Sequence, residues 1–319
     1  MPQKMKKKKL APSNIKRRVW NIVILTLFST FLLFYPGNNY YSHFFSYNRD
    51  LFAAQKKISE KEIRPIVYVK NVGIFPNISA QGAYVIDANS ATPVLERNKD
   101  AHFFPASTAK IITALVALDI YKHTDVLTVK RVISEGQVVG LVQGEQLRVQ
   151  ELLYGLLVHS GNDVAYVLAD NYGPGYDAFV ERMNEKAAQL SMNNSHFNNP
   201  AGLDDPRQYS SPFDLSLAGR KLLQNELLST IVSTPSITIS DVNFEHFHVL
   251  SNVNKLLGKI PGIGGLKTGY TEEAGENLVS FYKRNGHQFL IVIMKSDDRF
   301  YDTEAIVHWI DTNVGFVSI

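Results

Sequence analysis

The sequence predicts an α+β protein with one antiparallel sheet, preceded by a single N-terminal transmembrane helix. Two observations predict the sheet and its helices. Strand-like runs lie near both ends of the main body, at 83–95 and 276–295, and the segment between them has mainly helical periodicity. Strands placed in this way pair into one sheet, against which the intervening helices pack. A third observation, an uncharged apolar run at 19–35, predicts the membrane helix.

The net charge of +3 is divided unevenly along the chain. Residues 1–18 contain eight basic side chains and no acidic one, so the remainder holds 25 basic residues against 30 acidic ones. A domain that binds nucleic acid is normally basic where it folds, so no nucleic-acid partner is expected. The chain has no cysteine, which excludes thiol catalysis and thiolate metal sites and agrees with export.

The run from Val19 to Tyr35 follows directly on the basic tail. As a helix it rises roughly 25 Å, close to the hydrocarbon thickness of a bilayer, with Trp20 and Tyr35 at its two ends. We therefore expect a retained single-pass anchor in the cell membrane, with residues 1–18 cytoplasmic and the rest outside. The alternative is a cleaved signal peptide, but its apolar region is shorter, and no A-x-A pattern follows here.

After the anchor, residues 36–77 show no clear period and predict a stalk, and residues 78–319 form the expected folded domain. The domain begins with a hairpin at 83–87 and 94–95. Helices are predicted next at 105–121, 149–160, 162–173, 177–190 and 211–227. Two strands, 276–283 and 287–295, are joined by an Asn285-Gly286 turn, and a helix at 301–312 follows.

The motif Ser107-Thr108-Ala109-Lys110 stands at the start of the first predicted helix of this domain. Residues three apart lie on one helix face, so the Lys110 amine can reach the Ser107 hydroxyl. A serine becomes a nucleophile when a neighbouring base accepts its proton, and a lysine can be that base if its pKa is lowered. The helix N-terminus adds N–H donors beside the serine.

A second motif, Ser160-Gly161-Asn162, lies at a break between two predicted helices. Its hydroxyl can relay a proton, and its carboxamide can hold a substrate amide. Taken alone, the segment is better explained as a helix end followed by an Asn cap.

A third motif, Lys267-Thr268-Gly269, follows the glycine-rich run PGIGG and precedes Tyr270. A lysine and a hydroxyl on an edge strand can bind a carboxylate, and the glycine lets a substrate backbone approach. The three motifs stand 53 and 107 residues apart, in the order S-x-x-K, S-x-N, K-T-G. This trio is typical of penicillin-binding proteins and class A β-lactamases.

The surrounding sequence narrows the family. PASTAKIITALVALD, VQELLYGLLVHSGNDVAYVLA, FNNPAGLDD and SNVNKLLGKIPGIGGLKTGYTEEAGENLVS resemble the low-molecular-mass D-alanyl-D-alanine carboxypeptidases, from about Ser79 to Trp309. The resemblance implies a DD-peptidase/β-lactamase-like fold, an antiparallel sheet flanked by helices with Ser160 on an all-helical lobe. Many members carry a further β-rich domain and a C-terminal anchor, so we expect the N-terminal helix to provide the anchoring here.

The resemblance also implies a role for each motif residue. Ser107 is similar to the nucleophile, Lys110 to the base and Ser160 to the proton relay. The remaining matches are substrate-binding: Asn162, Lys267, Thr268, Gly269, Tyr270 and Arg299. The expected oxyanion hole consists of the backbone N–H groups of Ser107 and Tyr270. Like-charge repulsion from Lys267 is expected to help keep Lys110 neutral.

The implied activity is removal of the terminal D-alanine from peptidoglycan stem peptides, with covalent acylation by β-lactam antibiotics and no metal or organic cofactor. A DD-endopeptidase on the same scaffold is the nearest alternative. A β-lactamase is disfavoured, because the second motif is S-G-N and no E-x-x-L-N stretch is present. A catalytically idle wall-binding module is disfavoured by the intact trio. His246 and His248 alternate as on one strand face but lack a third ligand, so no metal site is predicted there.

Overall fold

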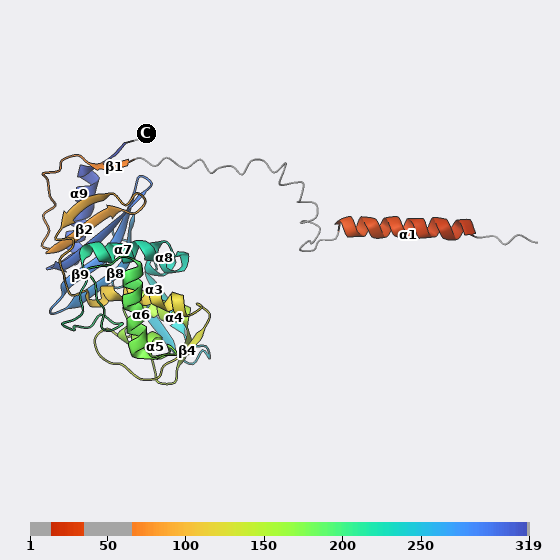
Figure 1. Ribbon diagram of the computed structural model, residues 1–319, viewed down its shortest axis with the longest axis horizontal. Coiled ribbons are helices and arrows are strands. Elements are labelled where there is room, and N and C mark those ends of the chain that lie inside the picture. The colour runs from red at the N-terminus through yellow and green to blue at the C-terminus, as the bar shows by residue number, and fades with distance from the viewer. Residues whose placement is uncertain (1–13, 35–65, 318–319) are drawn as a thin grey trace, which may run out of the picture. The chain divides into compact units, whose positions relative to one another are not determined.

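The computed structural model describes residues 14–34 and 66–317. The chain divides into two units, Met1–Ile63 and Arg64–Ile319. In the first unit the described part is helix α1, Asn14–Phe34 (Figure 1). Among the described helices, none combines the length and the apolar character needed to cross a membrane. The transmembrane helix predicted for 19–35 is therefore unsupported by the structure and stays a prediction.

Most of the predicted stalk lies outside the described residues, but its last part contains a strand. Strand β1, Ile66–Val69, pairs antiparallel with β11, Val314–Val317. Strand β1 could not be predicted, because four residues are too few to show a period and its partner β11 is far away in the sequence.

The second unit is built on a five-stranded antiparallel sheet, which confirms the predicted fold class. The strand order is β3-β2-β10-β9-β8, so β8 lies at one edge. The bounds are Gly82–Asp87 for β2, Pro93–Arg97 for β3, Ile263–Thr271 for β8, Gly275–Arg284 for β9 and His287–Ser296 for β10.

The turn between β9 and β10 is the predicted Asn-Gly turn. Asn285 and Gly286 both have positive φ, 49° and 77°, which matches the twist of a two-residue hairpin. Beyond the turn, alternate residues of β10 enter opposite faces of the sheet. Leu290, Val292 and Met294 pack with the helical lobe, whereas Phe289, Ile291 and Ile293 pack with α9. The sheet thus has a hydrophobic core on each face.

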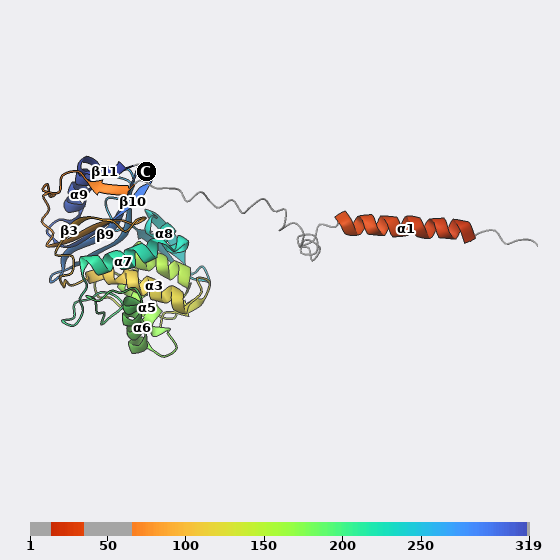
Figure 2. The ribbon, with the colours of Figure 1, turned by 45° about the horizontal axis from the view of Figure 1, so that its top comes forward.

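Helices cover both faces of the sheet (Figures 1 and 2). Helices α3 to α6 gather at one end of the unit as a helical lobe, and α9 lies against the other face. Their bounds are Lys110–Ile120 for α3, Val149–Leu157 for α4, Asn162–Asp170 for α5, Tyr176–Gln189 for α6, Pro212–Leu223 for α7, Glu226–Val232 for α8 and Arg299–Asn313 for α9.

Three details differ from the sequence-based expectation. The helix predicted at 211–227 is broken, because the Asn225 side chain accepts the Leu228 N–H and starts α8 as a new helix. The first turn of the helix predicted from 105 is a 3₁₀ helix, η1, Ala106–Ala109. Two short hairpins were not predicted, β4–β5 (Val126–Thr128, Gln146–Arg148) and β6–β7 (Ser236–Ser240, Phe247–Ser251).

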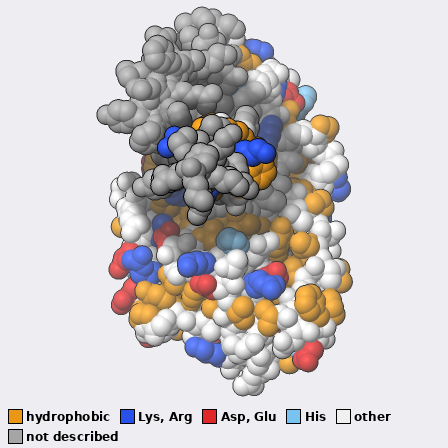
Figure 3. Space-filling model, turned by 90° about the vertical axis from the view of Figure 1, so that its right-hand side faces the viewer, with side chains coloured by type: hydrophobic (Ala, Val, Ile, Leu, Met, Phe, Trp, Pro, Cys, Tyr) orange, Lys and Arg blue, Asp and Glu red, His pale blue; other side chains and the backbone are white. Residues whose placement is uncertain are grey.

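The surface carries no simple charge pattern on the face drawn in Figure 3. Basic and acidic side chains are interspersed there with hydrophobic ones, without a patch of one sign (Figure 3).

The fully buried Asp302 carboxylate of α9 ties the start of the domain to the sheet. It accepts the Ser79 and Ala80 N–H groups at 2.9 and 2.8 Å and the Ser79 and Ser296 hydroxyls at 2.8 and 2.6 Å. We expect Asp302→Asn to lower the free energy of unfolding by about 1–3 kcal/mol, because buried donors lose an ionised acceptor. Urea denaturation measures the change.

The exposed neighbour Asp297 provides the control for this substitution. Asp297→Asn is expected to change the free energy of unfolding by less than about 0.5 kcal/mol. Equal effects of the two substitutions would contradict the role assigned to the Asp302 carboxylate.

Candidate active site

Ser107 lies in the 3₁₀ turn η1, directly before α3, and two glycines pack closely against this turn. A Cβ at Gly202 would lie 1.9 Å from the Ala106 carbonyl oxygen, and one at Gly269 would lie 3.0 Å from the Ser107 nitrogen. Gly202 also has a φ of +82°, which favours glycine. The turn is therefore held between the loop that contains Gly202 and strand β8.

A third contact that holds the turn comes from strand β9. The Asn277 side chain on β9 is completely buried, and its Nδ2 donates to the carbonyl oxygens of Phe104 and Pro105 at 2.9 and 3.1 Å. Its Oδ1 accepts the Lys295 N–H at 2.8 Å. Sequence reasoning missed Asn277; the available signal was a polar residue at an inward position of an apolar strand.

The Lys110 amine is the centre of the site. Its side chain is fully buried, and Nζ lies 2.7 Å from each of three oxygens: Ser107 Oγ, Asn162 Oδ1 and the Ala201 carbonyl. Burial lowers the pKa of Lys110 to about 7, while nearby Asp163 acts in the opposite direction. A large fraction of the amine is therefore neutral near pH 7, and a neutral amine can accept a proton.

The second motif reaches Lys110 through Asn162. Both ends of the Asn162 carboxamide are bonded within the protein: Oδ1 accepts from Lys110, and Nδ2 donates to the Glu135 carbonyl at 2.8 Å. The carboxamide thus links Lys110 to the loop around Gly136, and its expected role in holding a substrate amide stays a prediction. Ser160 is nearly buried and has a φ of +67°, a conformation that a serine rarely adopts.

Such strain is typical of functional sites. Because of this positive φ, the Ser160 side chain has a different direction from the one it would have if α4 continued through residue 160.

The third motif lies on β8, the edge strand. Lys267 and Thr268 are almost fully buried, and Lys267 Nζ donates to the Thr268 carbonyl at 2.8 Å. The pKa of Lys267 is well below its usual value, chiefly because of burial and then because of the charges of Lys110 and Arg299. The expected repulsion between the two lysines is therefore present beside Lys267, and burial is the main cause of the low pKa of Lys110.

Two further predicted residues are Tyr270, within β8, and Arg299, which contacts this strand. Arg299 is the first residue of α9, and its Nη1 donates to the Gly269 carbonyl at 2.8 Å. Its backbone N–H donates to Glu276 Oε2 at 2.9 Å, and burial lowers the pKa of its guanidinium. The Tyr270 side chain is 61% exposed, so the residue contributes its backbone to this strand and not a packed ring.

The loop at 199–208 was also missed by sequence reasoning. Asn199 Oδ1 accepts the N–H groups of Gly202 and Leu203 at 2.8 and 3.0 Å, and Gln208 Nε2 donates to the Leu203 carbonyl at 2.7 Å. These bonds fix the turn that presents the Ala201 carbonyl to Lys110. The signal in the sequence was N-P-A-G, a turn pattern with a polar first residue.

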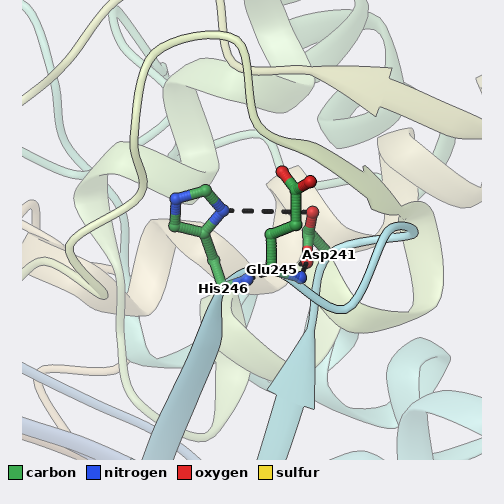
Figure 4. Close-up of side chains that lie close together, drawn as sticks. All are labelled: Asp241, Glu245 and His246. Atoms are coloured by element: carbon green, nitrogen blue, oxygen red, sulfur yellow. Dashed lines mark hydrogen bonds and ion pairs between the residues drawn. The ribbon is translucent and has the colours of Figure 1, made fainter.

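The structure separates His246 from His248. His248 Nε2 lies 2.7 Å from the buried carboxylate of Glu145, whereas His246 lies beside Asp241 and Glu245 (Figure 4). One ligand atom from each of these three residues lies within 4.8 Å of the others. Asp241 Oδ1 accepts the Glu245 and His246 N–H groups at 2.8 and 2.9 Å, so hydrogen bonding within the β6–β7 turn accounts for this cluster.

The chain matches the family profile described as D-alanyl-D-alanine carboxypeptidase, peptidase S11, over residues 70–298. It is 31% identical to D-alanyl-D-alanine carboxypeptidase DacF of Bacillus subtilis, over 67% of this chain and 57% of that protein. It is 36% identical to DacB2 of Mycobacterium tuberculosis, over 69% of this chain and 76% of that protein. The match thus spans little more than half of the Bacillus relative.

Solved structures agree with these sequence matches. The Streptomyces K15 DD-transpeptidase superposes with a TM-score of 0.70 at 29% identity, over 74% of this chain and 98% of that one. Since the family profile covers most of the chain and the solved structure shares its fold, this protein belongs to the D-alanyl-D-alanine carboxypeptidase family of serine peptidases.

Proposed function

We propose that this chain is a serine-type D-alanyl-D-alanine carboxypeptidase that trims peptidoglycan stem peptides through an acyl-enzyme on Ser107. The observation that carries the proposal is the 2.7 Å separation between Lys110 Nζ and Ser107 Oγ, with the amine fully buried. Burial supplies the neutral base that an unactivated serine needs.

In acylation, neutral Lys110 accepts the hydroxyl proton of Ser107, and Oγ attacks the carbonyl carbon between the two D-alanines. The negative charge that forms on the carbonyl oxygen is stabilised by the N–H groups of Ser107 and Tyr270. One such donor contributes about 3 kcal/mol to lowering the barrier in comparable sites. The C–N bond then breaks, and the proton passes from Lys110 through Ser160 to the leaving amine.

In deacylation, water attacks the ester carbonyl, Lys110 again accepts the proton, and Ser107 leaves as a hydroxyl. Two further residues would bind the terminal carboxylate of the substrate, Lys267 through its charge and Thr268 through its hydroxyl. A bound carboxylate favours the charged form of Lys267 and so raises the pKa that burial has lowered. Arg299 supports this site by donating a hydrogen bond to the Gly269 carbonyl of β8.

A second candidate activity is transpeptidation, with an amine in place of water as the acyl acceptor. It is favoured by the Streptomyces K15 proteins, one named a D-alanyl-D-alanine carboxypeptidase and another a DD-transpeptidase. The two reactions share the acylation step and differ in the product.

Membrane attachment is the second part of the proposal. Residues 1–18 form the cytoplasmic tail, 19–35 the anchor and 36–77 the stalk of a catalytic domain at 78–319 that lies outside the cell membrane. Its support is the sequence: 17 uncharged residues directly behind eight basic ones.

The product of a pentapeptide stem tests the activity. We expect the purified protein to release D-alanine and leave the tetrapeptide, as measured by mass spectrometry, and to gain the mass of one penicillin on incubation with the drug. Ser107→Ala is expected to abolish both, because no other group can form the ester. Ser90→Ala, at an exposed serine, is the control and should retain both.

A penicillin adduct that still forms with Ser107→Ala would contradict the assignment of Ser107 as the nucleophile. Joining of two peptides through an added amine would instead favour transpeptidation, and cleavage of a cross-linked dimer without D-alanine release would favour an endopeptidase.

The pH dependence of acylation follows from the lowered pKa of Lys110. The base must be neutral, so the acylation rate constant is expected to fall about tenfold per unit below pH 7 and to level off above pH 8. Stopped-time measurement of penicillin acylation between pH 5.5 and 9 gives this profile. Lys110→Arg should be inactive throughout, and Lys259→Ala, at an exposed lysine, should keep the wild-type profile. A flat profile would contradict Lys110 as the base.

Membrane attachment is tested by fractionating cells that express the full chain. We expect the protein in the membrane pellet after alkaline carbonate extraction, because an apolar span of this length is held by the bilayer core. A protease added to intact spheroplasts should digest the catalytic domain. Recovery of the full chain in the soluble fraction would overturn the anchor.

A further inference from the structure

The β1–β11 ribbon lies at one end of the second unit, away from α5 and α6, and it has apolar side chains on its outer face (Figures 1 and 2). Ile66 and Val317 are cross-strand partners on this face, and Tyr68 lies two residues further along β1. Val67, between Ile66 and Tyr68, is buried in the core. An antiparallel ribbon at the surface normally alternates apolar residues inside with polar residues outside. Here the outward positions are apolar as well, so this face is suited to a partner less polar than water.

The loop after β1 extends the apolar surface. Val72 exposes 87% of its surface, and Ile74 and Phe75 expose about half of theirs. The loop is nevertheless fixed in place. The Trp309 side chain of α9 donates from Nε1 to the Ile74 carbonyl at 2.7 Å, and the Arg97 guanidinium lies 4.8 Å from the centre of the Phe75 ring. Exposed apolar side chains that gather on a fixed backbone mark interaction sites.

We call these six side chains the apolar end face: Ile66, Tyr68, Val72, Ile74, Phe75 and Val317. A basic residue lies between its two parts. Lys70 is exposed, its Nζ donates to the Thr312 carbonyl at 3.1 Å, and it forms no ion pair with another residue that the structure describes. Asp311, on the same turn of α9, is already paired with Arg284 at 3.2 Å. An ammonium beside aliphatic and aromatic side chains is the combination with which proteins bind the surface of a bilayer that contains anionic lipids.

The place of the apolar end face in the chain favours lipid as its partner. Residues 36–65 join the proposed anchor at 19–35 to Ile66, the first residue of the face. Thirty residues span at most roughly 100 Å, so in the proposed arrangement the face never lies further than that from the bilayer. Covalent attachment of this kind raises the local concentration of a partner, so that even a weak second contact is occupied.

We propose that the apolar end face docks the catalytic domain onto the surface of the membrane. Val72 and Ile74 enter the interfacial region, and the rings of Tyr68 and Phe75 lie at the level of the lipid headgroups. Docking at this end turns α5 and α6 away from the bilayer (Figure 1). The inference rests on the proposed membrane attachment and adds to it a second, reversible contact that fixes the orientation of the domain.

A fluorescent label in the loop tests the docking in the full chain. The protein has no cysteine, so Gly73→Cys creates a single labelling site. Gly73 has room for the new side chain, because no atom beyond its two neighbours lies within 4 Å of an added Cβ. The labelled protein is reconstituted into vesicles of phosphatidylethanolamine and phosphatidylglycerol, with and without a nitroxide-bearing lipid. We expect the nitroxide lipid to lower the fluorescence at position 73 about twofold, because the label lies at the membrane surface.

Val249→Cys is the matched control for the label. Val249 is also strongly exposed but lies on β7, which pairs with neither β1 nor β11, so its label should not be quenched. A second variant combines Val72→Asp and Ile74→Asp with Gly73→Cys. It should lose the quenching at position 73, because two carboxylates oppose insertion into the interface. It should still sediment with the vesicles and form the penicillin adduct, which shows that the anchor and the fold are retained.

Equal fluorescence at position 73 with and without the nitroxide lipid, in protein that sediments with the vesicles, would overturn the docking and leave the anchor intact. A label that is shielded from aqueous iodide but is not quenched by the lipid would overturn it too, because protein would then cover the face. Quenching that persists in the double aspartate variant would show that Val72 and Ile74 do not make the contact. Failure of the wild type to sediment with the vesicles would overturn the proposed membrane attachment itself.

Discussion

Placing a lysine amine in a fully buried position is the constraint on which the rest of this site depends. An ammonium group loses its hydration there, so Lys110 is held near neutrality and its three neighbouring oxygens must replace water. Those oxygens come from three separate segments: the 3₁₀ turn η1, the start of α5 and the loop at 199–208. The turn η1, the helical lobe and the loop must therefore all be in place before the amine has its partners.

Close packing of the backbone positions the nucleophile Ser107, whereas hydrogen bonds position the base Lys110. Gly202 and Gly269 let a loop and a strand approach the same turn, and the Asn277 carboxamide holds the backbone that leads into it. Two glycines and one amide thus set the distance between the serine and the edge strand. The irregularity in β10 belongs to the same arrangement, because it frees the Lys295 N–H for Asn277.

The sequence predicted the parts of this protein that depend on local patterns. The Asn285-Gly286 turn and the individual strands are short local signals, and the three motifs are recognised by their order and spacing along the chain. Asn277 could not be singled out, because its Phe104 partner lies 173 residues away in the sequence. The division of α7 from α8 depends on one Asn225 cap within a continuous helical period, and the small hairpins have strands of three to five residues. The source of the low Lys110 pKa was predicted only in part, since burial depends on the packed lobe.

The position of β8 at the edge of the sheet has a consequence for the solubility of the protein. An unpaired edge is a template on which any extended chain can build, including another copy of the same protein, and this is a common route to aggregation. In this protein Lys267 lies buried within the edge strand, and Arg299 donates a hydrogen bond to the Gly269 carbonyl of the same strand. Lysines within an edge strand are among the devices by which proteins protect such edges. The lysine of the third motif thus protects the folded protein against self-association at an edge that has to stay open.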